Sequence, residues 1–80
     1  MQVWVMERGE KYEGGRVVGI YATRDMARAD VLDGMKDLAR FRDAAGRAEV
    51  EADGSLYMES GCDWLTLTPY EVQGQLELPR

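Results

Sequence analysis

Hydrophobic residues gather in two short runs near the start of the chain, separated by a polar stretch. Gln2–Glu7 holds four consecutive apolar residues, and most of them favour β-strands. Arg16–Ala22 has the same character. Gly9–Gly15 between them is polar and rich in glycine, as the loops of hairpins are. The pattern predicts that the chain begins with a β-hairpin.

The next segment changes from the strand period to the helix period. Thr23 has the hydroxyl of a helix N-cap, and Asp25 places an acid in the first turn, where the helix dipole favours it. The pattern predicts a helix from there to about Ala45, with Gly46 ending it. Apolar residues recur along one stripe at Ala27, Val31, Met35 and Leu38, with Phe41 or Ala45 beyond.

Gly34 lies in the middle of this helix, where glycine costs about 1 kcal/mol relative to alanine. It marks either a break between two shorter helices or a close contact with another part of the backbone.

A second hairpin can be assigned in register. A three-residue loop at Ala52-Asp53-Gly54, with Gly54 at positive φ, puts Val50 opposite Leu56 and Ala48 opposite Met58 on one side. The other side then pairs Glu49 with Tyr57 and Arg47 with Glu59. A two-residue loop would instead pair Glu51 with Leu56, so the pattern favours the longer loop.

A last strand is predicted over Trp64–Gln73, after a turn at Ser60–Asp63. Pro69 interrupts it, and because proline cannot donate to a β-ladder, the strand is expected to be an edge strand or to bend there. Gln75–Leu78 either extends it or forms a tail. The sequence thus predicts one α+β domain over residues 1–80. Its fold is a small antiparallel sheet of four to five strands with one main helix packed on one face, in the order β-β-α-β-β-β.

The first two predicted strands are apolar on both faces. A single helix covers one face of a small sheet, so a second apolar face must be covered by the C-terminal segment, by a second copy or by a partner. The alternative is that both strands are central strands of an ordinary core. If a second copy covers the spare face, the expected homodimer contact is the side that carries Trp4 and Met6.

Charge is distributed unevenly along the chain. Residues 1–47 contain nine Lys/Arg and eight Asp/Glu, whereas residues 48–79 contain seven Asp/Glu and no base. An acidic half argues against direct nucleic-acid binding and allows a basic protein partner, although the same acids also serve solubility. No signal peptide or long apolar run is present, which predicts a cytoplasmic protein without a membrane segment.

Few residues offer catalytic or metal chemistry. The chain has one cysteine and no histidine, so the commonest general base and zinc ligand are both missing. Cys62 lies beside Asp63, which disfavours its thiolate. The run from Glu49 to Gly54 superficially resembles a calcium loop, but its twelfth position is Ser60 instead of the bidentate glutamate. The expectation is a non-enzymatic protein with no catalytic residues, no metal site and no cofactor.

Protein binding is the function that the residues favour. Tyrosine and tryptophan are frequent anchors of interfaces, and here they lie among the acids of the second half. The predicted partner-binding residues are Glu49, Glu51, Asp53, Tyr57, Glu59, Asp63 and Trp64.

The segment Val17-Val18-Gly19-Ile20-Tyr21-Ala22-Thr23-Arg24-Asp25-Met26-Ala27 resembles small uncharacterised proteins of phages and bacteria that begin β-β-α. The resemblance covers residues 2–32 and implies a phage or prophage origin, with no activity attached.

The sequence leaves three hypotheses about function. The first is a phage-like protein that binds and modulates or inhibits another protein, in its sharpest form an anti-defence or anti-CRISPR protein with an acidic surface. The second is a homodimeric structural module, and the third is a small ligand-binding protein or enzyme.

Overall fold

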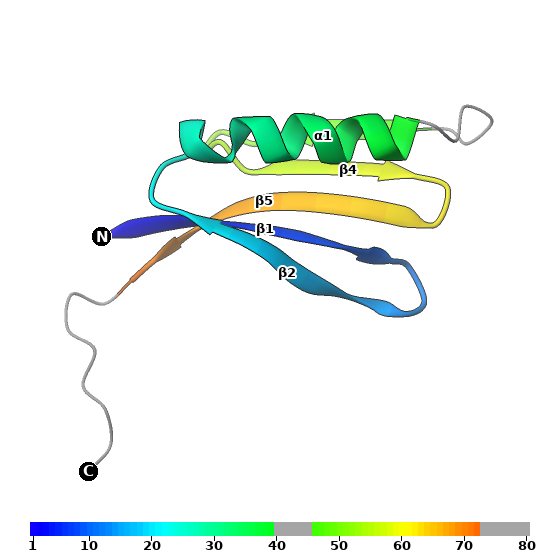
Figure 1. Cartoon of the computed structure of the whole chain (residues 1–80), viewed down its shortest axis with the longest axis horizontal. Helices are drawn as coiled ribbons and strands as arrows, with labels where there is room; N and C mark the ends of the chain where they lie inside the picture. Colours follow the sequence, from blue (N-terminus) through cyan, green and yellow to red (C-terminus); the bar gives the residue numbers. More distant parts are fainter. Residues whose placement is uncertain (40–45, 73–80) are drawn as a thin grey trace, which may run out of the picture.

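A computed structural model, which describes residues 1–39 and 46–72, has one antiparallel sheet of five strands with a helix packed on one face (Figure 1). The strand order in the sheet is β2-β1-β5-β4-β3, so β2 and β3 are its edges. The elements follow the predicted order β-β-α-β-β-β and confirm the α+β class. Along the chain they are β1 (Gln2–Glu10), β2 (Gly14–Tyr21), η1 (Asp25–Ala27), α1 (Arg28–Ala39), β3 (Gly46–Val50), β4 (Leu56–Ser60) and β5 (Asp63–Glu71).

The first hairpin has longer strands than the sequence predicts. Gly9 pairs with Gly15 inside the ladder, so the loop is much shorter than the predicted Gly9–Gly15. Glu10 pairs with Gly14, which has a φ of 77° and closes the turn. The register shifts between Met6 and Glu7, a β-bulge in this pair.

The second hairpin has the predicted register. Val50 pairs with Leu56, and Glu49 pairs with Tyr57. Gly54 takes a φ of 89°, and its N–H donates to the Glu51 carbonyl at 3.0 Å. The next connection, between β4 and β5, is a two-residue turn in which Gly61 has a φ of 61°. A positive φ at the first position suits the right-handed twist of the two strands.

Of the two alternatives predicted for the last strand, an edge strand or a bend at Pro69, the edge strand is wrong. β5 lies between β1 and β4, although it contains Pro69. The pairing with β4 extends only as far as Leu67, while that with β1 continues through Pro69 to Glu71. Pro69 therefore pairs with β1 alone. On its other side there is no strand with which a backbone N–H could form a ladder bond.

The helical segment begins where the sequence predicts. The Met26 N–H donates to the Thr23 hydroxyl oxygen at 3.2 Å across the 3-10 turn η1. Helix α1 then runs without interruption through Gly34, so Gly34 marks no break. Gly46 is the first residue of β3, whereas the sequence predicts that it ends the helix; the last predicted turn, up to Ala45, lies outside the described residues. Phe41, Ala45 and the end of the last predicted strand at 73–80 lie outside the described residues.

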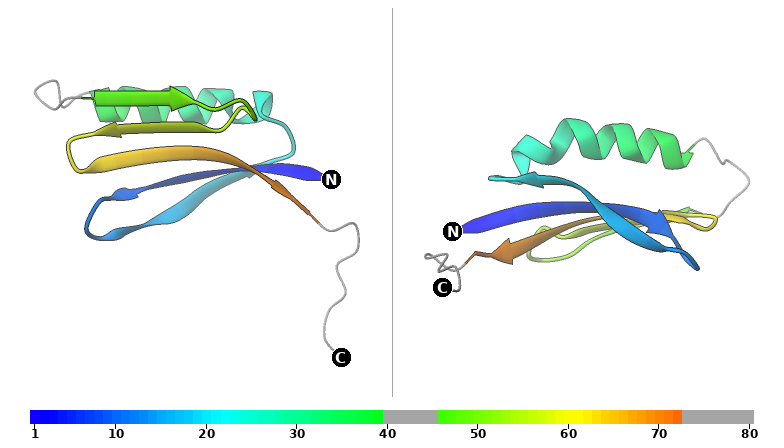
Figure 2. Two further views of the ribbon diagram at one scale, coloured as in Figure 1. Left: turned by 180° about the vertical axis from the view of Figure 1, so that it is seen from behind. Right: turned by 60° about the horizontal axis from the view of Figure 1, so that its bottom comes forward.

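The core lies between α1 and the sheet. Its buried members are Trp4, Met6, Ala27, Val31, Leu38, Leu56, Leu65 and Leu67. This corrects the prediction that Trp4 and Met6 form a homodimer face: their side chains are only 8% and 3% exposed because the helix covers that side of β1. Figure 2 shows α1 on one side of the sheet and no described element against the other.

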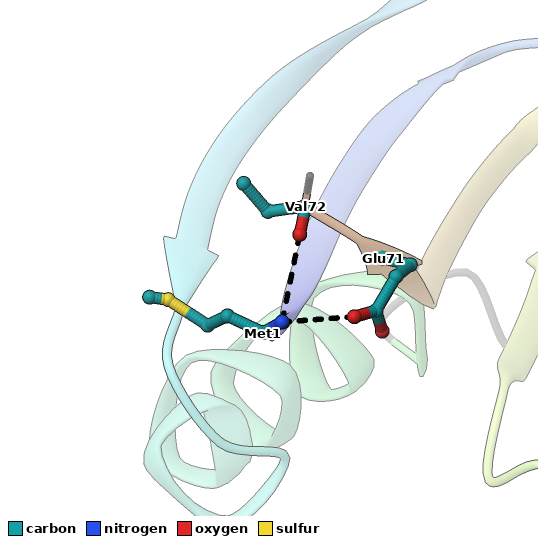
Figure 3. A network of polar contacts seen from close by, with 3 residues as sticks. All are labelled: Met1, Glu71 and Val72. Carbon is teal, nitrogen blue, oxygen red and sulfur yellow. Dashed lines mark hydrogen bonds and ion pairs between the residues drawn. The ribbon is translucent and has the colours of Figure 1, made fainter. Parts of the chain in front are cut away.

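The first residue extends the pairing of β1 with β5 (Figure 3). The Val72 N–H donates to the Met1 carbonyl at 2.7 Å, and the Met1 ammonium lies 2.8 Å from Glu71 Oε1. Both partners of the ion pair are mostly exposed, so it contributes at most about 1 kcal/mol. Its value is to fix the end of the central strand pair.

Candidate protein-binding face

The side of the sheet away from α1 is the candidate site, and we call it the open face. Alternate residues of a strand point to opposite sides, so the residues between the helix-covered ones point to it. The register places cross-strand neighbours along this face in rows such as Ile20–Val5–Thr68 and Val17–Glu7–Thr66–Tyr57–Glu49. The open face comprises Val3, Val5, Glu7, Val17, Ile20, Glu49, Tyr57, Glu59, Trp64, Thr66, Thr68 and Tyr70.

The part of the open face over β2, β1 and the end of β5 is apolar. Ile20 is 66% exposed, Tyr70 51% and Val17 50%. Val3 and Val5 lie between them and are half-buried. Neighbouring apolar side chains on one flat surface form a patch of the kind that marks interaction sites, unlike single exposed residues.

Trp64 lies across the hairpin end of the open face. Positions 15, 9 and 64 form one row across β2, β1 and β5, and the first two are glycines. A Cβ on Gly15 would come within 2.3 Å of the indole, and one on Gly9 within 2.7 Å of it. The indole therefore rests on the backbone of two neighbouring strands, where only glycine leaves room for it. This packing leaves Trp64 half-buried.

The β4 side of the open face is acidic. The Tyr57 hydroxyl donates to Glu59 Oε2 at 2.5 Å, and Lys11 Nζ lies 3.4 Å from the same oxygen. Glu49 is exposed beside Tyr57, which it faces across β3 and β4. The structure thus brings together four predicted partner-binding residues on one face: Glu49, Tyr57, Glu59 and Trp64.

The other three predicted residues lie apart from this group. Glu51 and Asp53 belong to the β3–β4 turn, and Asp63 lies at the opposite end of β4 and β5. The Ser55 N–H donates to Asp53 Oδ1 at 2.8 Å. Hydrogen bonds from Ser55, from its hydroxyl first and then its backbone, hold the pKa of the Asp53 carboxyl below its usual value. Asp53 therefore has a structural role in the turn.

The residues that sequence analysis missed are Val17, Ile20, Tyr70 and Glu7. Their alternation with the core residues Trp4 and Met6 is visible in the sequence. This alternation does not indicate which of the two apolar faces packs against the helix, because that depends on the tertiary structure. Once Met6 is known to be buried, the strand period assigns Glu7 and Val5 to the uncovered side.

Open grooves lie on the helix side of the sheet. One, of about 300 Å³, lies between α1 and β2 and is crossed by two polar contacts. Arg8 Nη1 lies 3.2 Å from Asp37 Oδ2, and the Tyr21 hydroxyl donates to Asp30 Oδ2 at 2.5 Å. Desolvation, reinforced by the bond to Asp30 and by its negative charge, raises the pKa of Tyr21 to about 12.

The residues considered for chemistry are dispersed. Cys62 is exposed in the β4–β5 turn, and Ser60 is buried at the end of β4. Among residues 1–39 and 46–72, no group of three or more His, Cys, Asp or Glu side chains is arranged to hold a metal ion. No helix in the same part of the chain is long and apolar enough to cross a membrane.

Comparison with protein families, with curated protein sequences and with solved structures finds no match for this chain. The function is therefore argued from the open face itself.

Proposed function

We propose that this chain is a non-enzymatic protein that binds another protein through the open face of its sheet and thereby modulates or inhibits that partner. The observation that carries the proposal is the group of exposed apolar side chains at Val17, Ile20 and Tyr70 on the face that no described element covers.

The layer structure of the fold supports this function. An apolar sheet face is normally packed against another layer, and within the described residues α1 supplies such a layer on one side only. Exposing Ile20 and Val17 to water on a single flat surface has a free-energy cost, about 25 cal/mol for each Å² of apolar area. A partner that covers this surface recovers that free energy on binding.

The acidic side of the face limits which partner fits. Glu49 and Glu59 adjoin the apolar patch through Tyr57, so the complementary surface combines apolar and basic groups. Imitation of nucleic-acid charge, as in an anti-defence or anti-CRISPR protein of a phage, has less support. Such an imitation needs a face that is acidic throughout, whereas the β1–β2 half of the open face is apolar.

The matched variants Ile20→Asp and Val50→Asp test the proposal. Both positions are β-branched, lie on edge strands and are about equally exposed, at 66% and 64%, but Val50 shares a side of the sheet with the helix-side residue Leu56. Each tagged protein is passed through lysate of the natural host at low and moderate salt, and bound proteins are identified by mass spectrometry. We expect a stoichiometric partner that wild type and Val50→Asp retain and Ile20→Asp loses. A partner that both variants retain would place the contact elsewhere.

A homodimer is the second candidate, and its interface would have to be the open face, because Trp4 and Met6 are buried under α1. It predicts a melting temperature that rises with protein concentration. A melt that stays constant over a wide dilution series would count against it.

A further inference from the structure

Glu7 is a carboxylate within the apolar half of the open face. Val17 lies beside it on β2 and Thr66 on β5, while Val5 precedes it along β1. Its side chain is half-buried. Within the described residues Glu7 makes no hydrogen bond or ion pair, unlike Glu59, which contacts both Tyr57 and Lys11. None of the residues 1–39 and 46–72 therefore offers its carboxylate a donor.

Covering the open face removes water from this carboxylate. An ionised carboxylate buried without a partner is far more costly than the burial of Val17 and Ile20 is favourable. A surface that docks on this face must therefore bring hydrogen-bond donors to Glu7, and a cation meets the requirement best.

We propose that the partner carries an arginine or lysine side chain, flanked by apolar residues, which it places over Glu7. This inference rests on the proposed function of the open face. The surroundings favour arginine, because its planar guanidinium can bind a carboxylate through two donors while stacking on an aromatic ring. The Trp64 indole, one row further along the sheet and lying over Gly9, provides such a ring.

The same residue disfavours a second copy as the occupant. A copy that docked through its own open face would bring a second Glu7, and an ionised carboxylate offers no hydrogen-bond donor. Lys11 already pairs with Glu59, and the register places Arg47 opposite the same residue. Two such carboxylates brought together without donors would oppose the association of two copies. The wild-type chain is therefore expected to be a monomer.

A random peptide library displayed on phage tests the inference. Peptides selected on the wild-type chain are expected to contain an arginine or lysine between apolar residues. Their affinity should fall about tenfold or more for Glu7→Gln, because a bond between charged groups is replaced by a weaker one. Glu10→Gln is the control, since Glu10 lies on the same strand at a register position of the helix side and is exposed. Its affinity should remain that of the wild type.

The outcomes separate this inference from the proposed function. One outcome is that the selected peptides lack basic residues and yet lose their binding to the Ile20→Asp variant. That result would keep the open face as a binding site and overturn the role of Glu7. Peptides indifferent to both Ile20→Asp and Glu7→Gln would overturn both. A stable wild-type dimer in light scattering, dispersed by Ile20→Asp, would show that a second copy is the occupant and would also overturn the inference.

Discussion

At the scale of single residues, Gly34 has a packing role that outweighs its cost to the helix. A Cβ at this position would lie 2.4 Å from Leu65 Cδ1 and 3.1 Å from Met6 Cε. Leu65 is fully buried and Met6 nearly so. Of the two sequence interpretations, the close contact is therefore the right one, although the neighbours are side chains of the sheet and not its backbone.

We expect Gly34→Ala to destabilise the protein by about 1 kcal/mol. The gain in helix propensity is about 1 kcal/mol, and overpacking a filled core costs about 1–3 kcal/mol. Urea unfolding followed by far-UV circular dichroism measures the balance. Asp33→Ala is the control at the adjacent, exposed position and should change stability by about 0.5 kcal/mol or less. A Gly34→Ala protein more stable than wild type would show that the helix can move away from Leu65.

Tyr21 predicts a loss of stability in alkali. Its pKa is raised to about 12 in the folded protein and is about 10 in an unfolded chain. Proton binding therefore favours the fold below about pH 10, and this contribution disappears as the pH rises toward 12. The free energy of unfolding of wild type should fall more steeply over that interval than that of Tyr21→Phe, which lacks the phenol. Equal slopes in pH-dependent urea melts would contradict the raised pKa.

At the scale of elements, the row Gly15–Gly9–Trp64 joins three strands at the hairpin end of the sheet. We expect Gly15→Ala to displace the indole of Trp64, because the new Cβ would fall within 2.3 Å of it. The indole N–H signal of Trp64 in a proton–nitrogen NMR spectrum should shift, while that of Trp4, in the core on the other side, should not. Ala22→Gly is the control, because it exchanges the same two residue types beyond the end of β2, away from Trp64. An unchanged Trp64 signal would mean that the ring does not rest on Gly15.

The elements also show what the sequence can and cannot specify. The β3–β4 register was predictable because the turn residues Asp53-Gly54 and the apolar alternation agree on one pairing. The place of β5 was not, because Pro69 is normal evidence for an edge. It is compatible with the centre of the sheet only through the short length of β4, which ends its pairing at Leu67. Strand lengths and strand order arise from tertiary packing, which local patterns do not contain.

At the scale of the whole molecule, the sequence indicated that one apolar sheet face would be left over and the structure identifies which. Both faces carry large apolar residues, Trp4 on one and Ile20 on the other. Residue type alone therefore does not indicate which face the helix covers. The choice is made by η1 and α1, whose buried residues Ala27, Val31 and Leu38 pack on the side of Trp4. Four of the predicted partner-binding residues, Tyr57, Glu59, Glu49 and Trp64, share the open face. The apolar half of that face follows only from the position of the helix.

This arrangement predicts that substitutions at buried and at exposed apolar positions of the sheet destabilise the protein by different amounts. Leu65→Ala removes a fully buried side chain and should cost about 2–5 kcal/mol. Ile20→Asp replaces an exposed side chain on an edge strand, where the remaining cost is β-propensity, about 1 kcal/mol. Val50→Asp, equally exposed on the other edge, should match it. Chemical denaturation of the three variants gives the free energies directly. If Ile20→Asp costs several times as much as Val50→Asp, the open face is already covered in the isolated protein, and a partner would have to displace whatever covers it. If the two agree, the face is free in solution, and the loss of binding in Ile20→Asp can be assigned to the contact itself.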